Sequence, residues 1–233
     1  MATQASTRPQ KTGPRSLLRS SPLPNTATIG DLLKRLGNIP AERVRLNPTP
    51  GTATEKDVLD VLDRENRPCE LVEGTLVAKA VGYEESELAL LIGTFLNNYV
   101  RPRKLGIVTG ADGTIRLFPG LVRIPDVAFE SWGCFPDRRR PKTRIPRLAP
   151  DLVVEILSKG NTKPEMAKKL GEYFGAGVRV VWLVDHRKRT VRVHTAVDES
   201  VLIKQGQALD GGAVLHGFML RLDELFVNDE PPA

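Results

Sequence analysis

Two acidic residues lie within segments that the sequence predicts to be buried strands. Glu155 interrupts the apolar run of residues 151–157, and Asp126 lies between the apolar residues Ile124 and Ala128. A continuous apolar run rich in β-branched residues is typical of a strand covered on both faces. Strand alternation places Asp126 on the same face as Ile124 and Ala128. A carboxylate buried there is unfavourable unless a cation, a metal ion or hydrogen bonds compensate its charge.

A helix predicted at residues 163–175 supplies a third candidate. Its apolar stripe consists of Met166, Leu170, Tyr173 and Phe174. At about 100° per residue, Lys168 points away from this stripe into solvent, whereas Lys169 lies on its shoulder. A lysine on the shoulder can lay its aliphatic stem over the sheet and bring its ammonium group towards buried acids.

Two carboxylates and an ammonium group at one sheet edge suit metal-assisted phosphodiester hydrolysis. Carboxylate oxygens bind Mg²⁺ or Mn²⁺, usually together with water and substrate phosphate. The metal acidifies a bound water, and a nearby lysine can orient that water or stabilise charge on the phosphate. The same residues could equally form a buried ion network without catalysis, and their spacing does not separate the two interpretations.

Other catalytic patterns are not found in the sequence. The three histidines lack the HxxxH or HExxH spacing of a metal site, and His186 falls in a predicted turn, where a solvated or packing role is expected. No GxSxG elbow surrounds Ser158, and there is no GxxxxGK[ST] phosphate loop. Cys69 and Cys134 are too far apart in sequence for a CxxC metal site.

The elements that must position these residues alternate between helix and strand. Helices are predicted at 29–37, after the cap Thr54, at 84–100 and at 163–175, and strands at 69–80 (a pair, or one strand bent at Gly74), 106–110, 113–118, 121–130, 151–157, 178–185 and 190–196. Pro125 indicates a strand start or an edge within 121–130. We expect an α/β fold with a mixed central sheet, against which helices 84–100 and 163–175 pack. One domain is expected over residues 25–233, after a disordered basic tail at 1–24.

The net charge of +6 comes from the N-terminal part of the chain. Residues 1–50 hold eight Lys or Arg and two acids, so the remaining residues are neutral overall. The densest basic segment, PDRRRPKTRIPR at 136–147, is predicted to be a loop because its three prolines exclude a regular helix. It is either a solvated surface loop or one that contacts phosphates. The aromatic content of 5% offers no stacking platform for single strands.

The composition favours a protein of the cytoplasm. No run approaches the roughly 18 apolar residues of a membrane span. The N-terminal segment is rich in Arg and Ser and has no apolar signal core, so it is interpreted as a disordered extension, with a transit peptide as the alternative. Two cysteines are consistent with a reducing compartment.

Four motifs in order, CELVEGTLV, RIPDVAFE, APDLVVEILS and KKLGEYFGAGVRVVWLVD, resemble the Uma-type restriction endonuclease family of the PD-(D/E)XK nuclease superfamily. The resemblance covers residues 55–228. It implies a restriction-endonuclease-like core with flanking helices, with Asp126 as the aspartate of the PD motif and Glu155 as the acidic residue of the (D/E)XK motif. Leu157 stands where the superfamily expects its lysine. The resemblance instead points to Lys169, four residues before the tyrosine of EYFGAGV.

The resemblance also bears on neighbouring residues. Lys159 is the other nearby lysine, but it lies in a Gly/Asn turn and is expected to be solvated. Many relatives carry a histidine where this chain has Glu85, which could be a third metal-site carboxylate or a first-turn acid favoured by the helix dipole. Glu70 and Glu73, on the first strand pair, are weaker candidates.

The resemblance implies a magnesium-dependent (or manganese-dependent) endonuclease that hydrolyses DNA phosphodiester bonds. Two alternatives remain open. One is a nuclease that acts on RNA, and the other is a non-catalytic interaction module in which the acids and the lysine are structural. DNA is the expected partner, no membrane association is expected, and a homodimer is left open.

Overall fold

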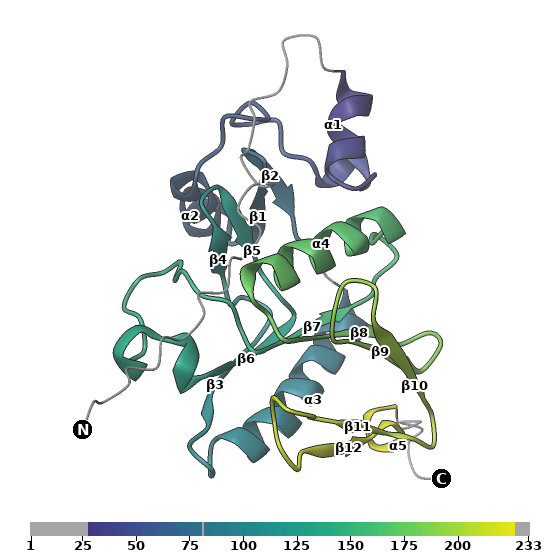
Figure 1. Ribbon diagram of the computed structural model, residues 1–233. Helices are drawn as coiled ribbons and strands as arrows, with labels where there is room; N and C mark the ends of the chain where they lie inside the picture. Colours follow the sequence, from purple (N-terminus) through teal and green to yellow (C-terminus); the bar gives the residue numbers. More distant parts are fainter. Residues whose placement is uncertain (1–27, 81, 227–233) are drawn as a thin grey trace, which may run out of the picture.

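A six-stranded mixed sheet forms the centre of the molecule in the computed structural model, which describes residues 28–80 and 82–226 (Figure 1). Its strand order is β10-β9-β8-β7-β6-β3. The strands are β3 (Gly106–Thr109), β6 (Val127–Ser131), β7 (Leu152–Ile156), β8 (Val180–Asp185), β9 (Thr190–His194) and β10 (Ser200–Lys204). β7 and β8 pair in parallel, and the other neighbours pair antiparallel. The expected mixed central sheet is therefore confirmed.

Two long helices cover opposite faces of this sheet (Figure 1). α3 (Tyr83–Val100) packs its buried residues with Leu152, Val154 and Ile156 of β7 in one core cluster. α4 (Lys163–Ala176) joins Val153 in a second cluster. α4 also connects the parallel strands β7 and β8, which need a crossover of this kind. The apolar run of β7 thus reflects a strand covered on both faces, as its sequence predicts.

A second, four-stranded antiparallel sheet lies on the α4 side, in the order β2-β1-β5-β4 (Figure 1). Its strands are β1 (Cys69–Val72), β2 (Thr75–Ala78), β4 (Ile115–Phe118) and β5 (Leu121–Arg123). The remaining elements are α1 (Ile29–Arg35), η1 (Ala41–Arg43), α2 (Glu55–Glu65), η2 (Trp132–Cys134), η3 (Pro136–Arg138), β11 (Ala208–Asp210), β12 (Met219–Arg221) and α5 (Leu222–Leu225). α2 begins after Thr54, which forms the expected cap.

The segment at 121–130 differs from its sequence-based description. It forms two strands in two different sheets, β5 and β6, divided by residues 124–126. Pro125 cannot donate a ladder hydrogen bond, which explains the break and confirms it as the signal of a strand start. Segment 69–80 is a hairpin, β1–β2, with Gly74 at positive φ in its turn. The break at 124–126 brings the second sheet next to Asp126.

The tail predicted at 1–24 lies outside the described residues, and a single domain over 25–233 stays a prediction. Among the described residues, Cys69 and Cys134 are free thiols. Over residues 28–80 and 82–226, no helix combines the length and apolar character that crossing a membrane requires.

Candidate active site

Glu155 faces α4 from β7 and is 4% exposed. Alternation along the strand puts it on the side of Val153, opposite the residues that pack on α3. Lys169 Nζ donates to both carboxylate oxygens, at 3.0 and 2.9 Å, and the Tyr173 hydroxyl donates to Oε1 at 2.5 Å. The cation expected for the buried acid is thus supplied by Lys169, as the helical periodicity predicts.

Lys169 also approaches a second buried carboxylate, Glu70 of β1. Its ammonium lies 3.4 Å from Glu70 Oε1, which also accepts a hydrogen bond from the Ile124 backbone N–H at 3.2 Å. Arg123 donates to Glu70 at 2.7 Å and to Glu172 of α4 at 2.8 and 2.5 Å. Burial alone would raise the pKa of Glu70, but the charges of Lys169 and Arg123 outweigh it and hold that pKa at about 2.

These contacts join five charged residues into one buried ion cluster. Its members are Glu70, Arg123, Glu155, Lys169 and Glu172. Three carboxylates face two cations, so the cluster is one positive charge short when all are ionised. Burial, followed by the charges of nearby acids including Asp126, raises the pKa of Glu155 against the opposing charge of Lys169. A proton or a further cation near Glu155 would therefore be favoured.

Asp126 lies next to this cluster and immediately precedes β6. The pairing of Val127 with Val154 places it across the ladder from Glu155. Its backbone N–H donates to the Val154 carbonyl at 3.1 Å, and its Oδ2 accepts from the Ile156 N–H at 2.7 Å. Side chains at opposed antiparallel positions share a face, with Cβ atoms about 4.5–5.5 Å apart. Asp126 and Glu155 are thus on the same face.

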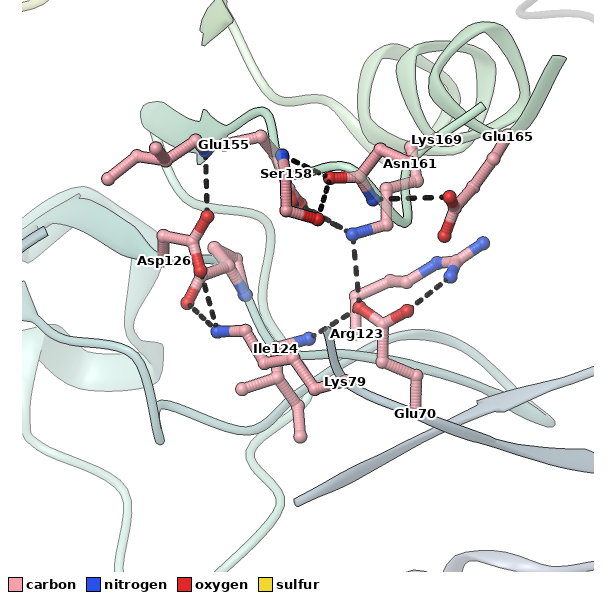
Figure 2. Close-up of polar contacts among 12 residues, drawn as sticks. Glu70, Lys79, Arg123, Ile124, Asp126, Glu155, Ser158, Asn161, Glu165 and Lys169 are labelled. Carbon is pink, nitrogen blue, oxygen red and sulfur yellow. Dashed lines mark hydrogen bonds and ion pairs between the residues drawn. The ribbon is translucent and has the colours of Figure 1, made fainter. Parts of the chain in front are cut away.

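Lys79, just beyond β2, supplies the cation of Asp126 (Figure 2). Its ammonium lies 3.0 Å from Asp126 Oδ1 and donates to the carbonyls of Ala111 and Pro125 at 2.8 and 3.3 Å. The side chains of Lys79 and Asp126 are 6% and 13% exposed. A lysine that follows the last residue of β2 therefore neutralises Asp126.

The start of α4 is fixed by a further set of polar contacts (Figure 2). Thr162 and Glu165 form a capping box, and Glu165 pairs with Arg43 at 2.9 Å. The Asn161 side chain donates to Glu165 at 3.1 Å and accepts from the Ser158 N–H at 2.9 Å. These contacts tie the turn after β7 to α4, and so they set the position from which Lys169 reaches Glu155.

The other candidates lie apart from this cluster. Glu85 approaches His186 Nε2 at 3.7 Å, and the neighbouring Glu84 approaches Nδ1 at 3.1 Å. Within the described ranges, no three or more His, Cys, Asp or Glu side chains are grouped as metal ligands. The structure therefore does not bring Glu85 into a three-carboxylate site with Asp126 and Glu155. His186 is in a turn, as predicted, and its side chain is 11% exposed beside Glu84 and Glu85, so it is packed rather than solvated.

The lysines near the site follow the predictions in part. Lys159 is exposed, as expected for a turn residue. Lys168, expected in solvent, instead donates to the Arg35 carbonyl at 2.7 Å and to Glu73 at 2.5 Å. The helical wheel gives its direction correctly but cannot show that α1 and the β1–β2 turn lie there.

Sequence reasoning missed four participants, Lys79, Arg123, Glu172 and Tyr173, and gave a fifth too little weight. Lys79 lies at the end of a short strand and has no periodic signal, and Tyr173 is described by its apolar position in the helix rather than by its hydroxyl. Glu70 did carry a signal, because it is an acid in the apolar strand CELV, as Glu155 is in β7. An acid flanked by buried apolar strand residues is therefore the more general sequence signal for a member of the buried ion cluster in this chain.

The two carboxylates fit a hard divalent cation only in part. Two carboxylates with substrate oxygens and water are an ordinary Mg²⁺ donor set. All four oxygens of Asp126 and Glu155 already accept hydrogen bonds or ion pairs, yet each carboxylate oxygen has two lone pairs. Asp126 and Glu155 could hold the ion once Lys79 withdraws from Asp126.

Comparison with known proteins defines the class of this fold. The crystal structure of "a putative nuclease belonging to DUF820" from Anabaena variabilis superimposes with a TM-score of 0.63, covering 73% of this chain and 96% of that chain at 20% identity. At that identity the match establishes a shared fold. A comparison with curated proteins gave no match.

The family follows from the sequence match. The model of the family Uma2, described as "Putative restriction endonuclease", matches residues 56–223, which is most of the chain. The protein belongs to the Uma2 family. The resemblance seen in the four motifs is thereby confirmed.

Proposed function

We propose that this protein is a metal-dependent endonuclease that hydrolyses DNA phosphodiester bonds at Asp126, Glu155 and Lys169. The observation that carries the proposal is the position of Asp126 across the ladder from Glu155, with the Lys169 ammonium on Glu155. Membership of a restriction endonuclease family supports a nucleic acid as substrate. The mixed α/β fold with its mixed sheet is compatible with a PD-(D/E)XK core.

In this proposal each residue has a distinct task. Asp126 and Glu155 would hold Mg²⁺ or Mn²⁺, which would acidify a water molecule and neutralise phosphate charge. Lys169 opposes the rise in the pKa of Glu155 and would place a positive charge beside the attacked phosphate. Tyr173 fixes the Glu155 side chain by its hydroxyl, and Lys79 would leave Asp126 if a cation bound there. The buried ion cluster lacks one positive charge, which favours such a cation.

A non-catalytic interaction module is the second candidate, and one observation favours it. The ion pairs of Lys79 with Asp126 and of Lys169 with Glu155 satisfy both acids without a metal. Buried ion pairs of this kind also occur as purely structural elements. The two candidates therefore differ in whether Lys79 can be displaced.

Cleavage of supercoiled plasmid tests the proposal. The purified protein should nick or cut plasmid DNA in Mg²⁺ or Mn²⁺, and EDTA should stop it. Ca²⁺ should support binding with little cleavage. A single-stranded RNA of matched length, assayed in parallel, separates a DNA nuclease from one that acts on RNA.

Matched substitutions separate this activity from a contaminant. Glu155→Gln should reduce cleavage at least about a hundredfold, because the amide cannot hold the cation. Glu199→Gln makes the same chemical change at an exposed position and should leave the rate unchanged. Equal rates for Glu155→Gln and the wild type would refute the proposed site.

A further inference from the structure

A cavity of about 140 Å³ lies beside the β3 edge of the main sheet, away from the buried ion cluster. Its walls come from β3, the start of β4, the end of β6 and the basic loop 136–147. The apolar lining includes Ile107, Ile115, Phe135 and Leu148. The volume is several times the roughly 30 Å³ that one water molecule occupies in the liquid and well below that of a drug-sized site. A single small ring system is the size of ligand that it suits.

Glu130 is an acidic residue that lines this cavity. It is 2% exposed, and its Oε1 accepts a hydrogen bond from the Thr109 hydroxyl at 3.0 Å. Its Oε2 is buried and has no hydrogen-bond partner among the described residues. Burial raises the pKa of Glu130 to about 7, the Thr109 hydrogen bond opposes this, and the charges of Asp151 and Arg140 act in opposite directions. A buried carboxylate oxygen without a partner is unfavourable, so a ligand donor that reaches this atom would be stabilised.

Arg140 complements Glu130 across the cavity. It belongs to the basic loop, lines the same space, and its charge lowers the pKa of Glu130. A ligand here would meet a carboxylate that accepts hydrogen bonds, a guanidinium that donates them, and apolar walls. A planar heterocycle with adjacent N–H donors and a carbonyl acceptor matches all three features.

We propose that this cavity receives one unstacked nucleobase of the nucleic acid, with guanine preferred. Guanine offers N1–H and N2–H to the Glu130 carboxylate and O6 to Arg140, whereas adenine lacks the N1–H donor and the O6 acceptor. Glu130 follows Asp126 by four residues of extended chain, so it lies on the same face and about 13 Å away. The assignment of the base to a nucleic acid substrate rests on the function proposed above.

Nucleoside binding tests the cavity without any cleavage. With metal-free protein at pH 8, where Glu130 is mostly ionised, guanosine should shift the amide NMR signals of β3 and β6. Inosine, which lacks the N2 amino group, and adenosine should each bind at least about tenfold more weakly. Glu130→Gln and Thr109→Val should each weaken guanosine binding about tenfold, and Glu199→Gln should not change it. Equal binding of guanosine and adenosine, or no shift at millimolar guanosine, overturns the proposal.

Cleavage products provide the second readout. If the protein cuts DNA, guanine should be enriched at a fixed distance from the cut, and Glu130→Gln should abolish that enrichment while leaving metal-dependent cutting. Cutting without base preference and without guanosine binding would refute the cavity proposal alone. Guanosine binding without any cutting would support the cavity and refute the nuclease proposal.

Discussion

Asp126 is hydrogen-bonded to both backbone neighbours of Glu155. Its N–H donates to the Val154 carbonyl at 3.1 Å, and its carboxylate accepts from the Ile156 N–H at 2.7 Å. The two acids therefore have a separation and a common face that are set by the β6–β7 ladder rather than by a loop. The Lys79 ammonium group contacts Asp126, and the Lys169 ammonium group contacts Glu155.

The substitution Asp126→Asn should destabilise the metal-free protein by about 2–4 kcal/mol, because it leaves the ammonium of Lys79 buried without its counter-charge. Urea unfolding in EDTA measures this. The double variant Asp126→Asn/Lys79→Met should recover part of the loss, because both members of the pair are then neutral. Losses that simply add would show that the ion pair contributes little.

Lys79→Met should increase the effect of Mg²⁺ on thermal stability. Without the Lys79 ammonium, the charge of Asp126 is not neutralised, and a divalent cation can bind in its place. Ligand binding to the folded state raises Tm by mass action. Thermal unfolding at increasing Mg²⁺ concentration is the measurement. Lys159→Met removes an exposed lysine near the end of β7 and serves as the control. A Tm increase no larger than that of the wild type would contradict competition between Lys79 and the metal.

Tyr173→Phe should lower the free energy of unfolding by about 1–2 kcal/mol, because the Tyr173 hydroxyl donates to a buried carboxylate. Equilibrium unfolding measures the change. Introducing Tyr173→Phe into the Glu155→Gln variant should have a smaller effect, since the acceptor is no longer charged. Tyr99→Phe, whose hydroxyl donates to the His216 carbonyl at an exposed site, is the control. An equal loss in both backgrounds would show that the hydroxyl acts through packing instead.

Glu130 should make stability depend on pH in the opposite direction to most acids. Its pKa is about 7 in the folded protein and near 4.5 when unfolded. The folded state therefore binds the proton more tightly, and stability falls as pH rises from about 4.5 to 7. Relative to the wild type, Glu130→Gln should gain about 1–3 kcal/mol between pH 5 and pH 8. A difference between the two proteins that stays constant with pH would contradict a protonated buried Glu130.

The sequence predicts local features of this fold well. The apolar run of β7 and the periodicity of α4 are local patterns, and they correctly place Glu155 in a buried strand and Lys169 within its reach. The association of β1 and β2 with α4 is not local. It brings Glu70 and Lys79 to the site and gives Lys168 a partner in Glu73. No pattern in the chain specifies such contacts, because they depend on how two sheets pack.

The division of residues 121–130 shows the same limit. Pro125 marks the break, yet only the tertiary structure assigns β5 and β6 to separate sheets. Glu85 illustrates the converse: a first-turn acid at the expected helix start contacts His186 instead of the proposed metal ligands. The residue type and helix position of Glu85 agree with a metal-ligand role. Its actual contact is determined by β8 and the following turn, which place His186 beside it.

The most direct test of the nuclease proposal is anomalous diffraction from crystals soaked in Mn²⁺. We predict one anomalous peak within coordination distance of both Asp126 and Glu155, about 2.0–2.3 Å from an oxygen of each, with the Lys79 ammonium displaced from Asp126. The Glu155→Gln crystal should lack the peak. A saturating soak that leaves Lys79 paired with Asp126, with no peak between the two acids, would contradict a metal-dependent active site at this position.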